Sequence, residues 1–174
     1  MIWYLALILL TGAERIVELV ISKRNAKLAF DKGGMEFGQR HFPFMVVLHT
    51  GFLLACLAEV FLVGRPFIPA LGIPMLVIAL LCQAGRYWVI HTLGSQWNTR
   101  VIVVPGAGRV DAAGLYRWMR HPNYWIVAIE GVALPLVHTA WVTAIAFTVL
   151  NAILLLRFRI PIENGALKLL ADRR

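Results

Sequence analysis

The chain has 174 residues, of which 60% are hydrophobic and 15% charged, and its mean hydropathy is +0.74. A soluble domain of this size usually carries about 25% charged residues to cover its water-facing surface. The composition therefore excludes an ordinary soluble domain and predicts an integral membrane protein. The length fits a single domain, residues 1–174, with room for four or five apolar helices of roughly 20 residues each.

The excess of basic residues has two explanations, and the positions of the charges distinguish them. The net charge is +8 and the isoelectric point is near 10.2, which would also suit a nucleic-acid-binding protein. Here Lys and Arg stand in blocks beside apolar stretches, as at Lys23, Arg24, Lys27 and Lys32. That pattern is typical of segments that face anionic lipid on the cytoplasmic side. No nucleic-acid-binding motif accompanies it. We therefore expect the lipid bilayer, and no nucleic acid, as a partner.

Five apolar stretches are expected to span the bilayer as helices: residues 2–21, 42–63, 68–93, 122–138 and 140–160. Glu14, Arg15 and Glu18 interrupt the second half of the first stretch. The fourth begins at Pro122, a favoured residue for a first helical turn, and Pro161 is expected to end or kink the fifth. The last two stretches are joined so closely that they should form a helical hairpin.

The longest polar stretch, residues 94–120, separates the third span from the fourth. Within it, residues 100–104 are short and rich in β-branched side chains, and Pro105-Gly106-Ala107-Gly108 is a turn signal. A short amphipathic tail, residues 165–174, follows the fifth span.

The distribution of Lys and Arg predicts the orientation. If the amino terminus lies outside, the segments after spans one, three and five hold five, four and five of these residues, 14 of the 17 in the chain. By the positive-inside rule the carboxyl terminus is then cytoplasmic. We expect the inner membrane of a bacterial cell as the location.

Ionisable residues within the expected spans are candidates for function, because a charge in lipid costs several kcal/mol unless it is paired or lines a cavity. Arg86 and Glu130 are the deepest of these, with Glu14 and Glu18 one turn apart in the first span. Two interpretations remain open. Arg86 pairs with a carboxylate and locks helix packing, or these groups line a polar pocket that opens to the cytoplasm and binds substrate.

Metal and haem sites are not expected. The cysteines, Cys56 and Cys82, lie inside apolar runs without CxxC spacing, which is typical of small buried side chains. A haem held by two histidines would need His49 and His91 at matched depths, and their positions along the spans do not match.

Two polar clusters flank the last two spans at the inner interface. In the second, Arg159 and Glu163 are four residues apart and share a face if the helix persists. The start of a helix also favours an anionic group nearby. Interfacial anchoring by Arg and Tyr is the simpler alternative, but convergence of two distant stretches favours a site. The first cluster contains Tyr116, Arg117, Arg120, His121 and Tyr124.

These residues resemble a known family of membrane enzymes, the isoprenylcysteine carboxyl methyltransferases. The resemblance covers about residues 83–167 and rests on Gly114-x-Tyr116-Arg117-x-x-Arg120-His121-Pro122-Asn123-Tyr124 followed by Arg159-Ile160-x-x-Glu163. The bacterial branch, whose members O-methylate alkylpyrones or alkylresorcinols, is more similar still, through Leu93-Gly94-x-x-Trp97-Asn98-Thr99-Arg100, Glu130 and Leu134-Pro135-Leu136.

The resemblance implies S-adenosylmethionine as the methyl donor, bound without a Rossmann fold, at a cytoplasmic region built from the polar loop and the tail. Gly106 and Gly108 are consistent with the absence of a Rossmann fold, because these two glycines are not part of a nucleotide-binding βαβ unit. Arg159 and Glu163 would be catalytic, at the junction of cofactor and acceptor, and Arg86 and Glu130 would bind substrate. The implied cofactor-binding residues are Trp97, Thr99, Tyr116, Arg120, His121, Pro122, Tyr124 and Asn164.

The sequence thus predicts an O-methyltransferase acting on an acidic hydroxyl or enol of a lipophilic small molecule. Methylation of an isoprenylcysteine-type carboxylate is the alternative, although the tail lacks the aromatic end of eukaryotic members. Asn164 replaces a glutamate that is common in the family, which bears on any carboxylate contact to the cofactor there. A non-catalytic membrane scaffold or small transporter is the rival from another class of protein.

Overall fold

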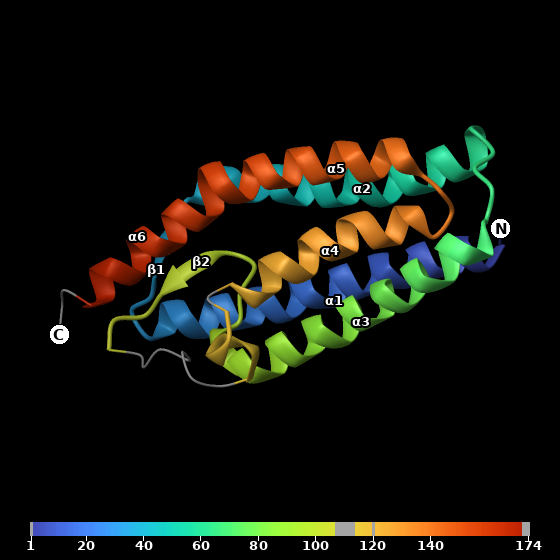
Figure 1. Cartoon of the computed structure of the whole chain (residues 1–174). Coiled ribbons are helices and arrows are strands. Elements are labelled where there is room, and N and C mark those ends of the chain that lie inside the picture. Colours follow the sequence, from blue (N-terminus) through green and yellow to red (C-terminus); the bar gives the residue numbers. More distant parts are fainter. Residues whose placement is uncertain (1, 107–113, 120, 172–174) are drawn as a thin grey trace.

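The protein, seen in a computed structural model, is an elongated bundle of helices with most of its irregular chain at one end (Figure 1). The structure describes residues 2–106, 114–119 and 121–171, with the backbone alone for residue 40 and residues 167–171. The mainly helical class predicted from the sequence is confirmed. The helices of the described residues are α1 (Ile2–Asp31), α2 (Phe42–Leu62), α3 (Pro69–Leu93), α4 (Pro122–Leu136), α5 (Trp141–Leu154) and α6 (Ile160–Ala171).

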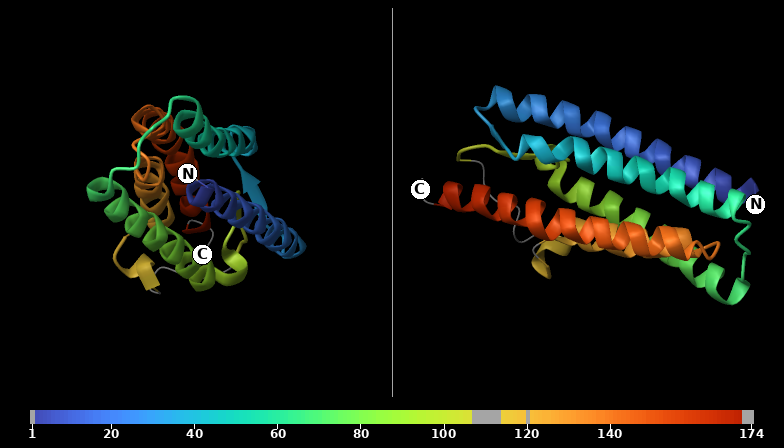
Figure 2. Two further views of the ribbon diagram at one scale, coloured as in Figure 1. Left: turned by 90° about the vertical axis from the view of Figure 1, so that its right-hand side faces the viewer. Right: turned by 90° about the horizontal axis from the view of Figure 1, so that it is seen from above.

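The α4 helix lies at the centre of the bundle. It packs against α3 on one side and against α5 on the other, and α5 lies beside α2 (Figures 1 and 2). Residues 137–140 join α4 and α5 into the expected hairpin. Gly131 of α4 faces the ring of Phe147, and a Cβ at this position would overlap that ring. A residue without a side chain therefore lets α4 and α5 approach closely, as is common between helices in membranes.

A small antiparallel sheet, which the all-helical prediction did not include, closes one end of the bundle. Strand β1 (Met35–Phe37) follows α1 and pairs with β2 (Val101–Val103), which follows α3. The buried side chains of Val101 and Val103 pack against Ala166 of α6. The sheet thus holds three parts of the chain together: the α1–α2 connection, the loop that follows α3, and helix α6. We call this end of the bundle the site end.

Pro161 does not end the last helix, so of the two expected outcomes, an end or a kink, the first is wrong. Leu155–Arg159 form a π-helical turn that joins α5 to α6, in which Ile160 N donates to Leu155 O, five residues back. Proline cannot donate a backbone hydrogen bond and its ring clashes with the carbonyl four residues earlier in an α-helix. The wider turn just before Pro161 accommodates both constraints, so the helix continues.

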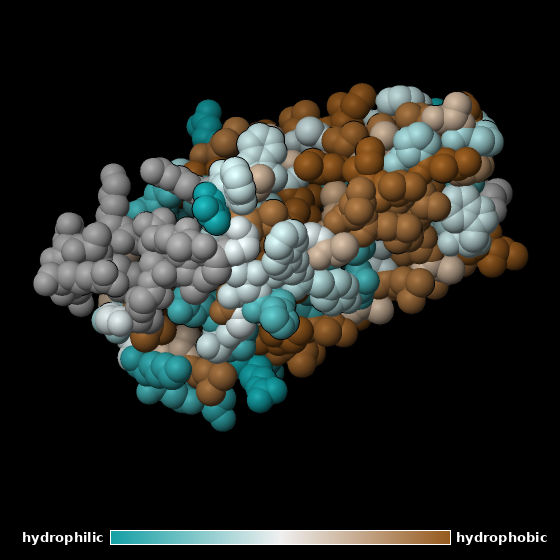
Figure 3. Space-filling model, turned by 60° about the horizontal axis from the view of Figure 1, so that its bottom comes forward, coloured by the Kyte–Doolittle hydropathy of each residue, from teal (hydrophilic) through white to brown (hydrophobic). Residues whose placement is uncertain are grey.

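The outer surface of the bundle is largely apolar. In Figure 3 brown side chains cover most of the helical shaft, whereas teal side chains gather mainly towards the site end. Among the described residues, three helical stretches are long and apolar enough to cross a membrane, namely Phe42–Leu62, Pro69–Gln96 and Trp141–Ala166.

The other two predicted spans fall short of that standard for identifiable reasons. Helix α4 has 15 residues, fewer than a straight crossing of a bilayer needs. Helix α1 is long enough and runs to Asp31, well beyond the predicted end at residue 21, but Glu14, Arg15 and Glu18 fall within its apolar part. These charges are the start of a buried network.

A network of charged side chains joins α1, α3 and α4 in the interior. Arg86 Nη2 lies 2.5 Å from Glu130 Oε2, and Arg86 Nε lies 3.5 Å from Glu18 Oε1. Arg15 contacts both carboxylates, at 2.9 Å from Glu18 Oε1 and 3.2 Å from Glu130 Oε1. Gln83 bridges the same groups, accepting from Arg15 Nη2 at 2.8 Å and donating to Glu130 Oε1 at 2.8 Å.

The network gives the partners of Arg86, which the sequence left open. Its main partner is Glu130, with Glu18 as a second carboxylate, so the ion pair of the first interpretation is present. Two guanidinium groups face two carboxylates, and the four charges balance. Because each buried charge is compensated by its neighbours, α1 can pack against the other apolar helices although it carries charged residues in its apolar part.

A second buried carboxylate fastens the opposite end of the bundle. Glu59 of α2 pairs with Arg65, with Oε1 2.8 Å from Arg65 Nη2. Its other oxygen accepts from Thr143 N and from Thr143 Oγ1, both at 2.7 Å. The carboxylate therefore caps the first turn of α5, where backbone N–H groups have no helical partner.

We expect Arg86→Met to lower the free energy of unfolding by about 3–5 kcal/mol, because it leaves an uncompensated carboxylate among buried groups. The double variant Arg86→Met/Glu130→Gln should recover at least half of that loss, since the remaining Arg15 and Glu18 neutralise each other. The measurement is denaturant or thermal unfolding of the purified protein in detergent.

Arg117→Met is the matched control, because Arg117 is exposed on the polar segment before α4 and its loss should change stability by less than about 0.5 kcal/mol. If the double variant were as unstable as the sum of its single variants, the idea that charge balance holds the network together would be wrong.

Candidate active site

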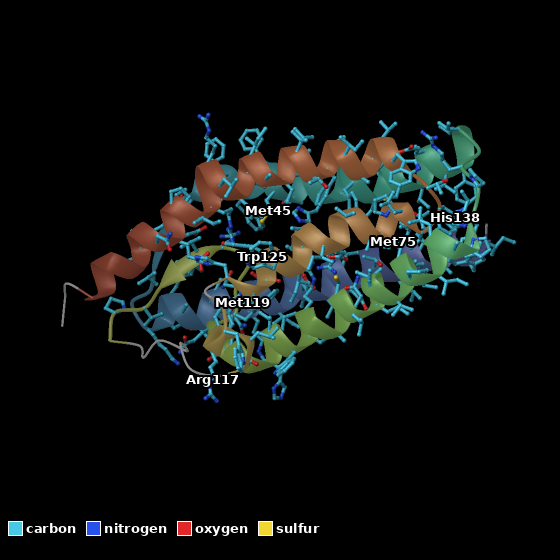
Figure 4. The ribbon with its side chains drawn as sticks, in the orientation of Figure 1. Met45, Met75, Arg117, Met119, Trp125 and His138 are labelled. Carbon is cyan, nitrogen blue, oxygen red and sulfur yellow. The ribbon has the colours of Figure 1, made fainter. Side chains whose placement is uncertain are left out.

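Most of the predicted catalytic and cofactor-binding residues come together at the site end, where the sheet, α6 and the start of α4 meet. Arg86 and Glu130, which were predicted to bind substrate, lie apart from them in the buried network. The 3₁₀ turn η3 (Gly114–Arg117) leads into this region. In Figure 4 Arg117 and Met119 lie on the segment before α4 and Trp125 lies near the start of α4, whereas Met75 and His138 lie towards the opposite end of the bundle. His121 and Tyr124 of the first polar cluster contact Glu163 of the second, so the two clusters of the sequence are neighbours in space.

The loop after α3 rests on the polar half of α1. Asn25 Nδ2 donates to Trp97 O at 2.7 Å and to Gly94 O at 3.1 Å. Ser22 Oγ donates to Asn98 Oδ1 at 2.7 Å and accepts from Thr99 N at 3.0 Å. Two buried polar side chains one turn apart on α1 thus fix the backbone of this loop.

Arg159 is the most constrained charge at the site end. Its side chain, at the end of the π-helical turn, is 6% exposed. Nη1 donates to Thr99 O at 2.8 Å and lies 3.3 Å from His41 Nε2. Its Cζ stands 5.9 Å from the centre of the Tyr124 ring. The buried Nε finds no hydrogen-bond acceptor among the described residues. An unpaired buried guanidinium N–H is costly, so this atom is a candidate contact for an anionic ligand.

Glu163 lies one turn further along α6, on the other side of Tyr124. The Tyr124 hydroxyl donates a short hydrogen bond to Glu163 Oε2, and His121 Nδ1 lies 3.4 Å from Glu163 Oε1. The rings of His121 and Tyr124 are stacked, with centroids 5.3 Å apart. The Glu163 side chain keeps 30% of its surface exposed. A carboxylate flanked by two aromatic rings is suited to a cationic ligand.

The local chain explains why these side chains converge. Pro122 is the first residue of α4, as predicted, and is buried. His121 precedes the helix with φ −134° and ψ 64°, and its side chain makes no capping hydrogen bond. Arg159 ends the π-helical turn and Glu163 lies in the first turn of α6, so their spacing of four places them on one side of the continuing helix. Tyr124 of α4 lies against this side of the helix and contacts both Arg159 and Glu163.

The remaining predicted residues have mixed surroundings. Trp97 is buried with Cys82, Val89 and Ile126, so its ring belongs to the apolar core and its backbone carbonyl to the loop contacts. Tyr116 packs at the edge of the same cluster, and burial together with the charge of Glu163 raises the pKa of its hydroxyl. Asn164 is exposed on α6. Arg120 lies outside the described residues.

Three residues that contact the site were not predicted, namely Ser22, Asn25 and His41. All lie before the segment in which the family motifs occur. Ser22 and Asn25 give a weak signal in the sequence, because two polar residues three apart lie on one helical face after an apolar run. His41 gives none that distinguishes it from the other histidines.

A small pocket opens between four helices, deeper in the bundle than Tyr124. Apolar side chains form most of its wall, together with one face of the charged network at Arg15 and Glu130. Val127, one of the lining residues, is three positions after Tyr124 on α4, which corresponds to about 4.5 Å along the helix. Its lining residues are Thr11, Arg15, His49, Phe52, Leu53, Val127, Glu130, Gly131 and Phe147.

No group of three or more His, Cys, Asp or Glu side chains that could hold a metal ion occurs within the part of the chain that the structure describes.

Comparison with known proteins gives the family of the chain. Residues 75–169 match the isoprenylcysteine carboxyl methyltransferase (ICMT) family. This segment contains most of α3, all of α4 and α5, Arg159 and Glu163, and it excludes α1, α2 and His41. No solved structure matches the chain.

Two similar proteins extend over nearly the whole chain. One is an uncharacterized protein of Bacillus subtilis (strain 168), YpbQ, which is 38% identical over 169 residues, 97% of both chains. The other is an uncharacterized protein of Haemophilus influenzae, 28% identical over 158 residues, 89% of both chains. The family match and the apolar helices show that the chain is a membrane protein that belongs to the isoprenylcysteine carboxyl methyltransferase family.

Proposed function

We propose that the chain is an S-adenosylmethionine-dependent O-methyltransferase acting on the acidic oxygen of a lipophilic small molecule. The observation that carries the proposal is the pair of opposite charges held by one tyrosine. Tyr124 bonds the Glu163 carboxylate through its hydroxyl and lies under the Arg159 guanidinium with its ring. Such a site suits a cation and an anion side by side, which are the two reactants of this methyl transfer.

The residues fit the cofactor by their charge and their aromatic faces. S-adenosylmethionine supplies a methyl group on a positively charged sulfonium. Glu163, partly exposed between His121 and Tyr124, offers the negative charge and the aromatic faces that favour a cation. The loop that bears Thr99, and Asn164 on α6, would hold the polar remainder. By bonding Glu163, the Tyr124 hydroxyl and His121 keep this carboxylate oriented.

Arg159 is proposed to hold the acceptor as its anion. Nη1 is occupied by Thr99 O, whereas Nε is a buried donor without an acceptor among the described residues. A charge-assisted bond from Nε to an acceptor oxyanion would satisfy it. Methyl transfer is an in-line displacement, so alignment of the acceptor oxygen with the methyl group is the main task of the site. The apolar chain of the acceptor would extend towards the pocket near Val127.

We further propose that all five helical stretches lie across the bilayer, with the site end in the cytoplasm. The 20 helical steps from Trp3 to Lys23 on α1 cover about 30 Å at about 1.5 Å per residue, close to the thickness of the hydrocarbon core. Exposed tryptophans mark both ends of the bundle, as in interfacial belts. They are Trp3 and Trp141 at one end and Trp88, Trp118 and Trp125 at the other. Acceptor would then enter from lipid and cofactor from water.

Two acceptor classes are compatible with this site, and both present an anionic oxygen. An alkylpyrone or alkylresorcinol would present an acidic enol or phenol, and an isoprenylcysteine-type acceptor a carboxylate. The family match suits the second class as well as the first.

S-Adenosylhomocysteine should stabilise the detergent-purified protein against heat, because a ligand that binds only the folded state at 100 times its Kd adds about 2.7 kcal/mol. His121→Ala should raise the Kd at least tenfold, whereas His91→Ala, an exposed site on α3, should leave it unchanged. If saturating S-adenosylhomocysteine did not raise the unfolding temperature, the result would favour the rival hypothesis of a non-catalytic membrane scaffold.

Arg159→Gln should abolish methyl transfer and leave the affinity for S-adenosylhomocysteine within about threefold. The acceptor anion would lose a charge-assisted hydrogen bond worth roughly 1.5–3 kcal/mol, and its oxygen would no longer be aligned with the methyl group. Arg157→Gln, an exposed change on the same turn, is the control. The assay offers a long-chain 4-hydroxy-2-pyrone, a 5-alkylresorcinol and an S-prenylated N-acetylcysteine, and detects a gain of one CH₂ by mass spectrometry. Undiminished turnover by Arg159→Gln would contradict the proposed role.

A further inference from the structure

His41, which no motif or family match includes, is buried directly against Arg159. It lies in the 3₁₀ turn η1 (Gln39–His41) between β1 and α2 and is 6% exposed. Its Nε2 lies 3.3 Å from Arg159 Nη1, the atom that also donates to Thr99 O. Arginine has no acceptor atoms. A hydrogen bond between the two side chains therefore requires that Nε2 carry no proton and accept from Arg159.

The backbone fixes the imidazole in this place. Gly38, which has a left-handed conformation (φ 67°), caps the turn, and His41 N donates to Gly38 O at 3.3 Å. A Cβ at Gly38 would overlap the His41 ring and would come within 2.8 Å of Ile162 Cδ1. Glycine thus supplies both the backbone conformation and the space that the ring fills.

We propose that His41 is a positioning residue of the methyl-transfer site, holding Arg159 in the orientation that binds the acceptor anion. The inference rests on the proposed function. With Nη1 fixed between Thr99 O and His41 Nε2, the guanidinium is unable to turn about its long side chain, and Nε keeps its direction. His41 therefore brings the segment before α2 into a site whose other members lie after α3.

The neutral form of His41 is the one that performs this task. Burial, and secondarily the charge of Arg159, hold the pKa of His41 below its ordinary value. Among the side chains that the structure describes, the other charged or titratable groups around it are the Arg100–Glu36 pair, next to Phe42, and Glu163 with Tyr124 beyond Arg159. As pH falls through the lowered pKa, Nε2 gains a proton, and two cations face each other at hydrogen-bond distance. Acceptor binding should then be lost at acidic pH and retained at neutral pH.

The direct test is a histidine titration by NMR of the full-length protein in detergent, labelled with ¹³C at the ring carbons. The chain has five histidines, and the resonance missing from His41→Gln identifies His41. We expect a midpoint below the ordinary value of about 6.5, with the neutral ring protonated at Nδ1. Arg159→Gln should raise the midpoint, because it removes the neighbouring charge. A midpoint near the ordinary value, unmoved by Arg159→Gln, would overturn the inference.

Turnover provides the second test, with whichever of the three acceptors the wild type methylates. His41→Ala should lower kcat/KM for the acceptor by 10- to 100-fold and leave the affinity for S-adenosylhomocysteine within twofold. In His41→Gln the amide oxygen replaces Nε2 as an acceptor and does not titrate. That variant should lose less than tenfold at neutral pH, and its activity should no longer fall on the acid side as the wild type does.

His91→Gln, at an exposed position on α3, is the matched control and should keep the wild-type pH profile. An acid decline in His41→Gln equal to that of the wild type would contradict the inference. Absence of methyl transfer by the wild type with every acceptor would count against the proposed function instead, and the NMR titration would still decide whether His41 and Arg159 are coupled.

Discussion

The buried network of Arg15, Glu18, Arg86 and Glu130 is the interaction on which the arrangement of the protein depends. Charges within an apolar bundle are tolerated only when they are paired. Here the pairing requires α1, α3 and α4 to meet at one level, with Gln83 bonded to the same groups. Because α1 lies outside the segment that matches the family, the network also joins the less characteristic part of the chain to the part with the recognisable motifs.

The position of α1 has consequences at the site end. Once the network fixes this helix, its last turns lie beneath the loop after α3, and Ser22 and Asn25 hold that loop by its backbone. The carbonyl of Thr99 is thereby directed at Arg159. The π-helical turn before Pro161 supplies the other partner, because it carries the helix past a proline and places Arg159 at its end. π-Helical turns of this kind are frequent at functional sites.

The proposed chemistry follows from an asymmetry between the two charges of the site. Arg159 is almost fully buried and has a donor without a partner among the described residues, whereas Glu163 remains partly exposed beside two aromatic rings. An anion held at depth and a cation nearer the surface match an acceptor that arrives from lipid and a methyl donor that arrives from water. One tyrosine, Tyr124, contacts both charges and so couples the two binding positions.

The sequence by itself determined the membrane character, the helix starts and the family, because these follow from composition, from local residues such as Pro122 and from the spacing of Arg159 and Glu163. Tertiary structure decided the partner of Arg86, the sheet that joins β1 to β2 and the contact of His41 with Arg159. Each of these joins residues far apart in the chain, for which a single sequence has no periodicity or spacing to read. The continuation of the last helix past Pro161 likewise depended on a wider turn that the local pattern does not specify.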